Sequence, residues 1–390
     1  MSADVRLRKV FYLPGFDPFP ARRYRELFRK EGAKQALISG YELALEPSTQ
    51  ANSWTAVLTV NGKSTRTELV VLEWSDIVRA SMSHSILATY GLLARTARIY
   101  LQSGALFRLL RLRKGPVIAA LYPVAILLGA LFLAIAVLLT SMWAVGGVIG
   151  MALGLMLAGA LFWLLRRLDN RTFAFYLMQD YSFAAANNGA NSQALEVRLK
   201  EFLEAVTRAM SGDADEVLII GHSSGAQLAV HLAANLVRAG LDTSRLGLLT
   251  IGQAIPMVSF LPDAQLLRRD MRDLSIGSIP WVDVSAPGDG CSFALCDPVA
   301  VSGVATPLQK WPLVLSAAFS QTLSEASLRD LRWRFFRIHF QYLCAFDQPG
   351  WYDYFQITAG PKTLRDRFQG RQNSPSRISK PVSPHTSIAP

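Results

Sequence analysis

The chain has 390 residues, enough for one large domain or two modest ones with a sizeable buried core. Its three cysteines, Cys291, Cys296 and Cys344, match no zinc-binding spacing and no secreted disulfide framework, so they fit a reducing compartment. The formal net charge of +11 concentrates beside one long apolar segment and in the C-terminal tail. That distribution favours anionic lipid headgroups over nucleic acid, and we expect no nucleic-acid binding.

The first part of the chain, residues 1–76, predicts the beginning of an α/β domain. The N-terminus, MSADVRLRKV, is charged and develops no export-type apolar region, so no signal peptide is expected. A helix is predicted at residues 21–34. The dipeptide Asn61-Gly62 is a strong hairpin signal between two of the strands. Strands are expected at residues 9–13, 41–46, 54–60 and 67–74.

Residues 77–171 have the composition of an insertion that carries a membrane hairpin. No charged residue occurs from Val117 to Leu165, about twice the roughly 20 residues that cross a bilayer. Two transmembrane spans are therefore predicted, at about 118–141 and 144–165. A soluble core would instead need two consecutive helices that are hydrophobic on every face. The preceding stretch, 88–113, suits a basic helix in the membrane interface or an ordinary packed helix with a solvated basic face.

Basic residues flank both outer ends of the predicted hairpin, and the tight connection between the spans carries none. By the positive-inside rule, both termini and all of the chain outside the hairpin are expected on the cytoplasmic side. The predicted location is an integral membrane protein, in the inner (cytoplasmic) membrane if the chain is bacterial. Gly146, Gly150 and Gly154 form a smooth helical face that either packs against the first span or mediates a homodimer.

Residues 172–371 supply further strands in alternation with helices, which predicts a mostly parallel sheet with helices on both faces. Helices are expected at 195–210 and 264–273, and strands at 172–178, 216–220, 246–251 and 281–285. The last segment, 372–390, is rich in Ser, Pro and basic residues and is predicted to be a disordered tail.

The sequence EVLIIGHSSG, residues 216–225, predicts the strand, turn and helix of a serine nucleophile elbow. In such a turn the serine has a strained backbone, and side chains two residues before and after it would collide unless both residues are small. Gly221 and Gly225 meet that demand around Ser223. An ordinary N-cap serine at a βα turn is the alternative interpretation.

A serine hydroxyl needs a general base and an acid that orients it. Of the five histidines, His339 lies downstream of Ser223, in the order that an elbow enzyme requires, and is the candidate base. His84, His222, His231 and His385 are placed less suitably. Asp289 lies in a Gly-Asp-Gly loop that follows the strand at 281–285 and is the candidate acid, with Asp297 next.

The tetrahedral intermediate needs two donors directed at its oxyanion. One is the backbone N–H of Ser224, the residue after the nucleophile. The other is expected in the loop Leu13-Pro14-Gly15-Phe16, from Phe16 or alternatively from Gly15, because a glycine lets the backbone approach the substrate.

With these residues in this order, the chain resembles the α/β-hydrolase superfamily and is most similar to its lipase and esterase members. The resemblance covers residues 9–75 and 172–365 and implies a Ser-His-Asp mechanism without a metal or organic cofactor. Residues 77–171 depart from the family and hold the inserted hairpin. The predicted function is a membrane-anchored serine hydrolase that cleaves ester or thioester bonds, with membrane lipids as the favoured source of acyl substrates. The alternatives are an acyltransferase with the same residues and a non-catalytic membrane scaffold or accessory protein.

Overall fold

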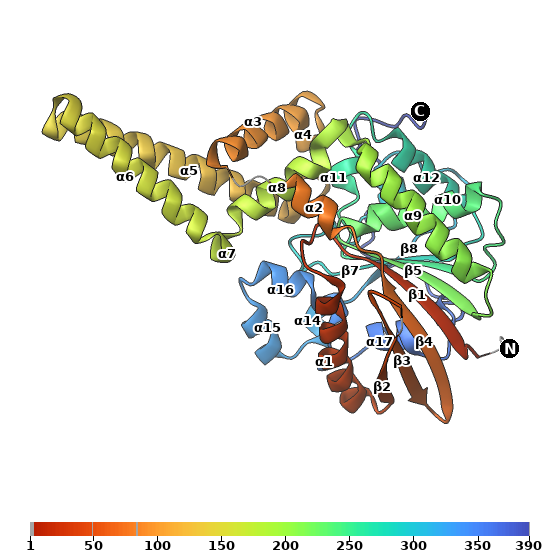
Figure 1. Cartoon of the computed structure of the whole chain (residues 1–390). Helices are drawn as coiled ribbons and strands as arrows, with labels where there is room; N and C mark the ends of the chain where they lie inside the picture. The colour runs from red at the N-terminus through yellow and green to blue at the C-terminus, as the bar shows by residue number, and fades with distance from the viewer. Residues whose placement is uncertain (1–3, 49, 83–84, 390) are drawn as a thin grey trace.

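A mostly parallel eight-stranded sheet forms the centre of the protein, described here from a computed structural model that covers all residues except 1–3, 49, 83–84 and 390 (Figure 1). The strand order across the sheet is β2-β3-β4-β1-β5-β6-β7-β8. The strands are β1 Leu7–Leu13, β2 Glu42–Pro47, β3 Ser53–Val60, β4 Lys63–Val71, β5 Glu216–His222, β6 Leu246–Ile251, β7 Trp281–Ser285 and β8 Leu313–Ser316.

The two halves of the chain that flank the insertion build this one sheet. Strands β2, β3 and β4 form an antiparallel meander, whereas β1 pairs in parallel with both β4 and β5, and β6 to β8 continue in parallel. The pairing of β1 with β5 places Leu13 opposite Gly221. The loop after β1 therefore begins beside the turn after β5, because parallel neighbours end at the same edge of the sheet.

The central strands are buried on both faces, which explains their unbroken apolar sequences. In β5, Val217 and Ile219 belong to one hydrophobic core, while Leu218 and Ile220 belong to the core on the opposite face. The helices on the Val217 face are α2 Ser75–Ser81, α9 Gln193–Met210, α10 Gly225–Arg238, α11 Pro256–Ser259, α12 Gln265–Ile276 and α13 Pro298–Val301. Those on the Leu218 face include α1 Ala21–Ser39, α14 Phe319–Thr322, α17 Tyr354–Ala359 and α18 Leu364–Arg367.

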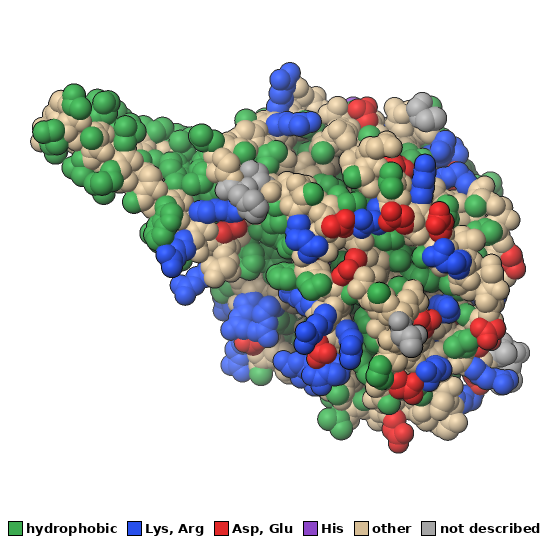
Figure 2. Space-filling view, viewed as in Figure 1, with side chains coloured by type: hydrophobic (Ala, Val, Ile, Leu, Met, Phe, Trp, Pro, Cys, Tyr) green, Lys and Arg blue, Asp and Glu red, His purple; other side chains and the backbone are tan. Residues whose placement is uncertain are grey.

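Between β4 and β5 the chain forms a helical insertion from which two long helices project (Figure 1). These are α5 Lys114–Val145 and α6 Gly147–Arg167, and both are long and apolar enough to cross a membrane. Their side chains are largely exposed; Phe132, for example, is 68% exposed. Figure 2 shows an almost continuous apolar surface along this projection, with basic side chains at its foot. The surface is unlike that of a soluble core helix, whose apolar side chains are covered by protein.

Two of the three spaced glycines are used for packing within the hairpin. A Cβ atom on Gly150 would lie 2.6 Å from the Ser141 carbonyl oxygen, and one on Gly154 would lie 2.8 Å from a methyl carbon of Leu138. Gly146 forms the turn between the helices, with φ +74°. Gly150 and Gly154 therefore face α5, which is the first of the two alternatives for this glycine face.

Four shorter helices and one 3-10 turn surround the foot of the hairpin. Helix α3 packs against α5, where the Tyr90 hydroxyl donates a hydrogen bond to the Leu127 carbonyl oxygen and Leu93 joins the same apolar cluster. A left-handed Gly104 separates α3 from α4, so the expected basic segment forms two helices. The helices of this region are α3 Ile86–Gln102, α4 Ala105–Leu112, α7 Asp169–Thr172, α8 Ala174–Ala185 and the 3-10 turn η1 Ala186–Gly189.

The strand expected at residues 172–178 is wrong, because this segment is helical. The Asp169 carboxylate accepts hydrogen bonds from the backbone N–H groups of Phe175 and Tyr176 and so caps the start of α8. The buried side chains of Phe175 and Met178 pack with α3 and α5. These contacts come from segments distant in sequence and outweigh the local preference for a strand.

The C-terminal segment also differs from the expected disordered tail. Residues 372–389 run along the domain, where Ile378 exchanges backbone hydrogen bonds with Leu295 and Asp297. The buried Arg268 guanidinium donates a hydrogen bond to the Ser387 carbonyl oxygen. Ile378 and Val382 pack against the apolar cluster beneath α4. The tail is ordered because its few apolar side chains pack against this cluster. The composition of the tail alone does not predict this contact. The remaining helices also pack on the Leu218 face of the sheet, and α15 and α16 lie near α1 in Figure 1. They are α15 Glu325–Leu331, α16 Phe335–His339 and the 3-10 turn η2 Gln341–Leu343.

Candidate active site

Ser223 lies at the sharp turn between β5 and α10, in a left-handed backbone conformation with φ +57°. A non-glycine residue in this region is strained, and such strain persists only where the surrounding structure imposes it. The turn raises Ser223 above the carboxyl edge of the sheet, and its side chain lines a cavity. The local geometry predicted from GHSSG is thus present.

Both flanking glycines are required by close packing. A Cβ atom on Gly221 would lie 2.5 Å from the Ala226 Cα atom, and one on Gly225 would lie 2.3 Å from the Leu13 carbonyl oxygen. Real Cβ atoms do not approach backbone atoms this closely. The helix α10 therefore starts directly against the loop after β1, and only glycine permits that approach.

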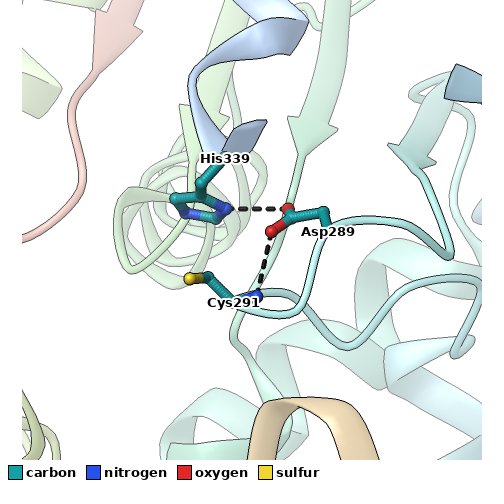
Figure 3. A group of neighbouring side chains, drawn as sticks. All are labelled: Asp289, Cys291 and His339. Atoms are coloured by element: carbon teal, nitrogen blue, oxygen red, sulfur yellow. Dashed lines mark hydrogen bonds and ion pairs between the residues drawn. The ribbon is translucent and has the colours of Figure 1, made fainter. Parts of the chain in front are cut away.

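His339 and Asp289 form a buried pair at the end of α16 and in the loop after β7 (Figure 3). The imidazole Nδ1 of His339 lies 2.8 Å from Oδ2 of Asp289. The other ring nitrogen, Nε2, is buried and makes no hydrogen bond within the described chain. His339 and Ser223 line the same cavity. Two residues separated by more than a hundred positions are thus brought to one site, as the sequence predicted.

The Asp289 carboxylate is held in place by three donors. It accepts hydrogen bonds from the His339 imidazole, the Tyr342 hydroxyl at 3.0 Å and the Cys291 backbone N–H at 2.9 Å. Burial alone raises the pKa of Asp289, but the charge of His339 and the hydrogen bonds from His339 and the Cys291 N–H bring it below its ordinary value. Asp289 is therefore ionised at neutral pH and holds the proton of His339 on Nδ1.

The structure separates the other candidate residues from this site. Asp297 caps α13 by accepting hydrogen bonds from the backbone N–H groups of Val299 and Ala300. His231 is buried beside Asp270, with Nδ1 2.6 Å from its carboxylate. His385 Nε2 lies 3.1 Å from the Ser103 carbonyl oxygen, and His84 lies outside the described residues. Asp289 is consequently the carboxylate that contacts the His339 ring.

The loop after β1 lies against Ser223, as expected for an oxyanion loop. A Cβ atom on Gly15 would lie 2.9 Å from the Ser223 Cβ atom. The Trp74 indole donates a hydrogen bond to the Pro14 carbonyl oxygen, and the Tyr176 hydroxyl donates one to the Phe16 carbonyl oxygen. These contacts fix the loop through its carbonyl groups. Gly15, Phe16 and Ser224 all line the cavity that holds Ser223.

The cavity, about 80 Å³, is mostly apolar and lies beneath α8. Helix α8 contributes one wall through Tyr176, Leu177 and Tyr181. The Tyr181 hydroxyl donates a hydrogen bond to the Ala119 carbonyl oxygen of α5, so the same helix contacts both the cavity and the hairpin. Phe183 and Ala184 of α8 also line the cavity, and the apolar lining from other segments is Phe16, Ala254, Met257, Val258, Phe336 and Phe340.

Asp180, also on α8, is a cavity residue that the sequence analysis missed. Asp180 and Ser224 line the same cavity. Burial raises the pKa of Asp180 to about 7, although the charge of His339 and the Ser224 side chain oppose that rise. The sequence around Asp180 gives no signal of this position, because only the tertiary fold brings α8 to the cavity beside the elbow.

Asp289, Cys291 and His339 are also a set of side chains of metal-ligating type, with ligand atoms within 4.8 Å of one another (Figure 3). The Asp289 carboxylate in this set already accepts the His339 hydrogen bond, for which a metal ion bound to the same carboxylate would compete. Burial raises the pKa of the Cys291 thiol, which disfavours the thiolate that a metal needs. The donor set therefore fits a metal poorly.

His222, directly before Ser223, makes a contact that links the elbow to the segment bearing His339. Its Nε2 lies 3.0 Å from the His339 carbonyl oxygen, and the two rings lie 4.8 Å apart between centroids. Because a carbonyl oxygen only accepts, Nε2 of His222 carries the hydrogen. Burial, with His339 nearby, lowers the pKa of His222 to about 3, so the ring is neutral. His222 is therefore a positioning residue for His339.

Comparisons with models of protein families, with curated proteins and with solved structures find no match for this chain. The site is therefore interpreted from its own geometry.

We predict that Gly225→Ala disrupts the elbow. The added methyl group collides with the backbone of the loop after β1, and we expect a loss of stability of about 3 kcal/mol. Gly91→Ala is the matched control, because a Cβ atom there meets nothing within 4 Å. Thermal unfolding of both variants in detergent measures the difference. Equal melting temperatures for Gly225→Ala and wild type would contradict the packing described.

We predict that His222→Phe reduces the reactivity of Ser223 on the order of 100-fold, because loss of the hydrogen bond releases the segment that carries His339. His222→Gln retains a donor at nearly the same position and should restore most of that reactivity. The rate of inactivation by a fluorophosphonate, followed from pH 6 to 9, measures the effect. If the Phe and Gln variants react at the same rate, the hydrogen bond has no positioning role.

Proposed function

We propose that the protein is a serine hydrolase that cleaves ester or thioester bonds, with Ser223 as nucleophile, His339 as general base and acid, and Asp289 as the residue that orients the imidazole. The observation that carries the proposal is the convergence of three features. A strained serine lines one cavity together with the histidine of a buried His-Asp pair, whose Nε2 makes no hydrogen bond among the described residues, and a glycine loop lies against the serine. Such convergence is the requirement for nucleophilic catalysis.

The proposed reaction has two steps. The Ser223 Oγ attacks the substrate carbonyl carbon while Nε2 of His339 takes the hydroxyl proton, and Asp289 stabilises the imidazolium. The backbone N–H groups of Ser224 and of Phe16, or alternatively Gly15, donate to the oxyanion. Collapse releases the alcohol or thiol, which receives the proton from His339. Water, deprotonated by His339, then attacks the acyl-enzyme, and the acid leaves as Ser223 regains its proton.

The elbow, the parallel sheet and the loop after β1 together support an α/β-hydrolase-like fold with an inserted membrane hairpin. We propose that α5 and α6 span the membrane, with the sheet domain and both termini on the cytoplasmic side, because basic residues flank the outer ends of the hairpin. Helix α8 joins the hairpin to the cavity wall, which favours acyl substrates drawn from membrane lipids. The alternative function is acyl transfer to an acceptor other than water, which would use the same residues.

We predict that wild-type protein is labelled covalently by a fluorophosphonate and that Ser223→Ala and His339→Ala lose at least about a thousandfold of the labelling rate. The reagent reacts only with an activated serine. Ser223→Ala removes the nucleophile, and His339→Ala removes the base that activates it. His231→Gln is the matched histidine control, because His231 contacts Asp270 and not the cavity. Gel fluorescence of purified protein measures the rates. Equal labelling of wild type and Ser223→Ala would show that Ser223 is not the nucleophile, and absence of wild-type labelling would favour the non-catalytic scaffold.

We predict a pH dependence that Asp180 controls. Above its pKa of about 7, Asp180 adds a negative charge beside Ser224, where the oxyanion forms; below that pKa it is neutral. The ratio of kcat/KM for Asp180→Asn to that for wild type should therefore rise on the order of tenfold between pH 6 and pH 9. A soluble short-chain ester provides the assay, with the exposed Asp213→Asn as control. A ratio that is constant with pH refutes this role.

We predict that the protein stays with the membrane pellet after extraction at alkaline pH. Two apolar helices in the bilayer core resist a treatment that removes peripheral proteins by disrupting their electrostatic contacts. Immunoblotting of pellet and supernatant measures the distribution, with a known peripheral protein as control. Release into the supernatant would contradict integral insertion.

A further inference from the structure

The turn that joins α15 to α16 exposes two large aromatic side chains among arginines. Trp333 is 75% exposed and Phe335 is 51% exposed. The Arg332 guanidinium lies 5.6 Å from the centre of the Trp333 ring. Residues 329–337, with sequence RDLRWRFFR, contain four arginines and a single acid, Asp330. We call residues 329–337 the arginine-tryptophan turn.

Only part of the positive charge in this turn is neutralised within the protein. Arg334 and Arg337 both pair with Asp330, at 3.1 and 3.0 Å. Arg329 and Arg332 have no ion pair among the described residues. Exposed aromatic rings beside arginines are costly in water and are enriched where a protein meets the headgroup layer of a membrane.

Aromatic contacts tie this turn to the foot of the hairpin. The Phe336 ring lies 4.4 Å from the Phe173 ring, and Phe173 directly precedes α8. Two residues after Phe173, the centre of the Phe175 ring lies 4.9 Å from the guanidinium of Arg166. Arg166 is the first charged residue after the apolar part of α6. Arg166 marks the polar boundary of the proposed span. The turn is thus connected to that boundary through two short contacts.

The basic surface continues from the turn toward the first helix. The Arg23 guanidinium of α1 lies 4.0 Å from the centre of the half-exposed Phe19 ring and 5.5 Å from that of Phe340. Figure 2 shows basic side chains gathered below the apolar projection, over the region that α1, α15 and α16 occupy in Figure 1. Phe336 and Phe340 also line the cavity of Ser223. The same short segment therefore carries both the basic surface and part of the cavity wall.

We propose that the arginine-tryptophan turn docks on the anionic headgroups of the membrane that the hairpin spans and thereby holds the mouth of the Ser223 cavity against the lipid surface. Arg329 and Arg332 contact lipid phosphates, and the Trp333 and Phe335 rings lie among the headgroups. This inference rests on the proposed membrane insertion and names the surface from which the substrate is taken. It requires a charged bilayer, whereas insertion of the hairpin does not.

Hydrogen exchange of the full-length protein in lipid nanodiscs tests the proposal without an activity assay. We expect the backbone N–H groups of residues 325–337 to exchange more slowly in discs of phosphatidylcholine with phosphatidylglycerol than in phosphatidylcholine alone. The Arg329→Glu/Arg332→Glu variant should lose this protection, on the order of tenfold, and high salt should weaken it in the wild type. Lys200→Glu is the matched charge control on α9, away from the hairpin.

A second measurement links docking to catalysis. Trp333→Ser/Phe335→Ser should lower kcat/KM for a lipid ester in anionic discs several-fold and leave the rate with a soluble short-chain ester unchanged. Leu37→Ala, at an 87% exposed apolar position near the end of α1, is the control. Equal exchange of residues 325–337 in both kinds of disc, or no effect of the arginine substitutions, would overturn the docking proposal. Fluorophosphonate labelling and membrane retention would still stand in that case, so failure of this proposal is distinguishable from failure of the proposed function.

Discussion

The close contact between the first turn of α10 and the loop after β1 is the constraint on which the candidate site depends. Gly225 presses against the Leu13 and Pro14 carbonyl groups, and Gly15 presses against Ser223. This contact accompanies the left-handed conformation of Ser223, and it places the loop after β1 directly beside the serine. A side chain at either glycine would separate the loops. The strain at Ser223 is compensated by the two buried hydrophobic cores that hold β1 and β5 together.

Helix α8 connects the candidate active site to the hairpin. Its first turn is capped by Asp169 of α7, its middle contacts α5 through Tyr181, and its inner face lines the cavity with Tyr176 and Asp180. A displacement of the hairpin foot would therefore move one wall of the cavity. The Tyr176 hydroxyl also bonds the Phe16 carbonyl oxygen, which ties this wall to the proposed oxyanion loop. The insertion is thus part of the site as well as its proposed anchor.

Local patterns predicted the elements whose structure depends on local constraints. The elbow, the Asn61-Gly62 hairpin and the two long apolar helices follow from turn sterics and from hydrophobic length, and all are present. The pairing of His339 with Asp289 was expected because Asp289 follows a strand that ends at the edge where the elbow lies, and because His339 follows Ser223 in the order that an elbow enzyme requires.

Other features depend on contacts between distant segments and gave no such signal. Residues 172–178 are apolar enough for a strand but are helical, because α3 and α5 surround them. The tail has few apolar side chains, yet Ile378 packs against a cluster formed by α4 and the loop before α13. Strand β8 is only four residues long and was not expected. Asp180 and His222 acquire their roles from neighbours that the sequence does not place beside them.

The central claim is that Ser223 is made nucleophilic by His339 within a preformed oxyanion site. A structure of the protein after reaction with a fluorophosphonate tests this most directly. The account predicts a phosphorus atom bonded to the Ser223 Oγ. One phosphoryl oxygen should accept hydrogen bonds from the N–H of Ser224 and from that of Phe16 or Gly15, with Nε2 of His339 beside the Oγ. A phosphonyl group bonded to any other residue, or one whose oxygen faces away from both loops, would contradict it.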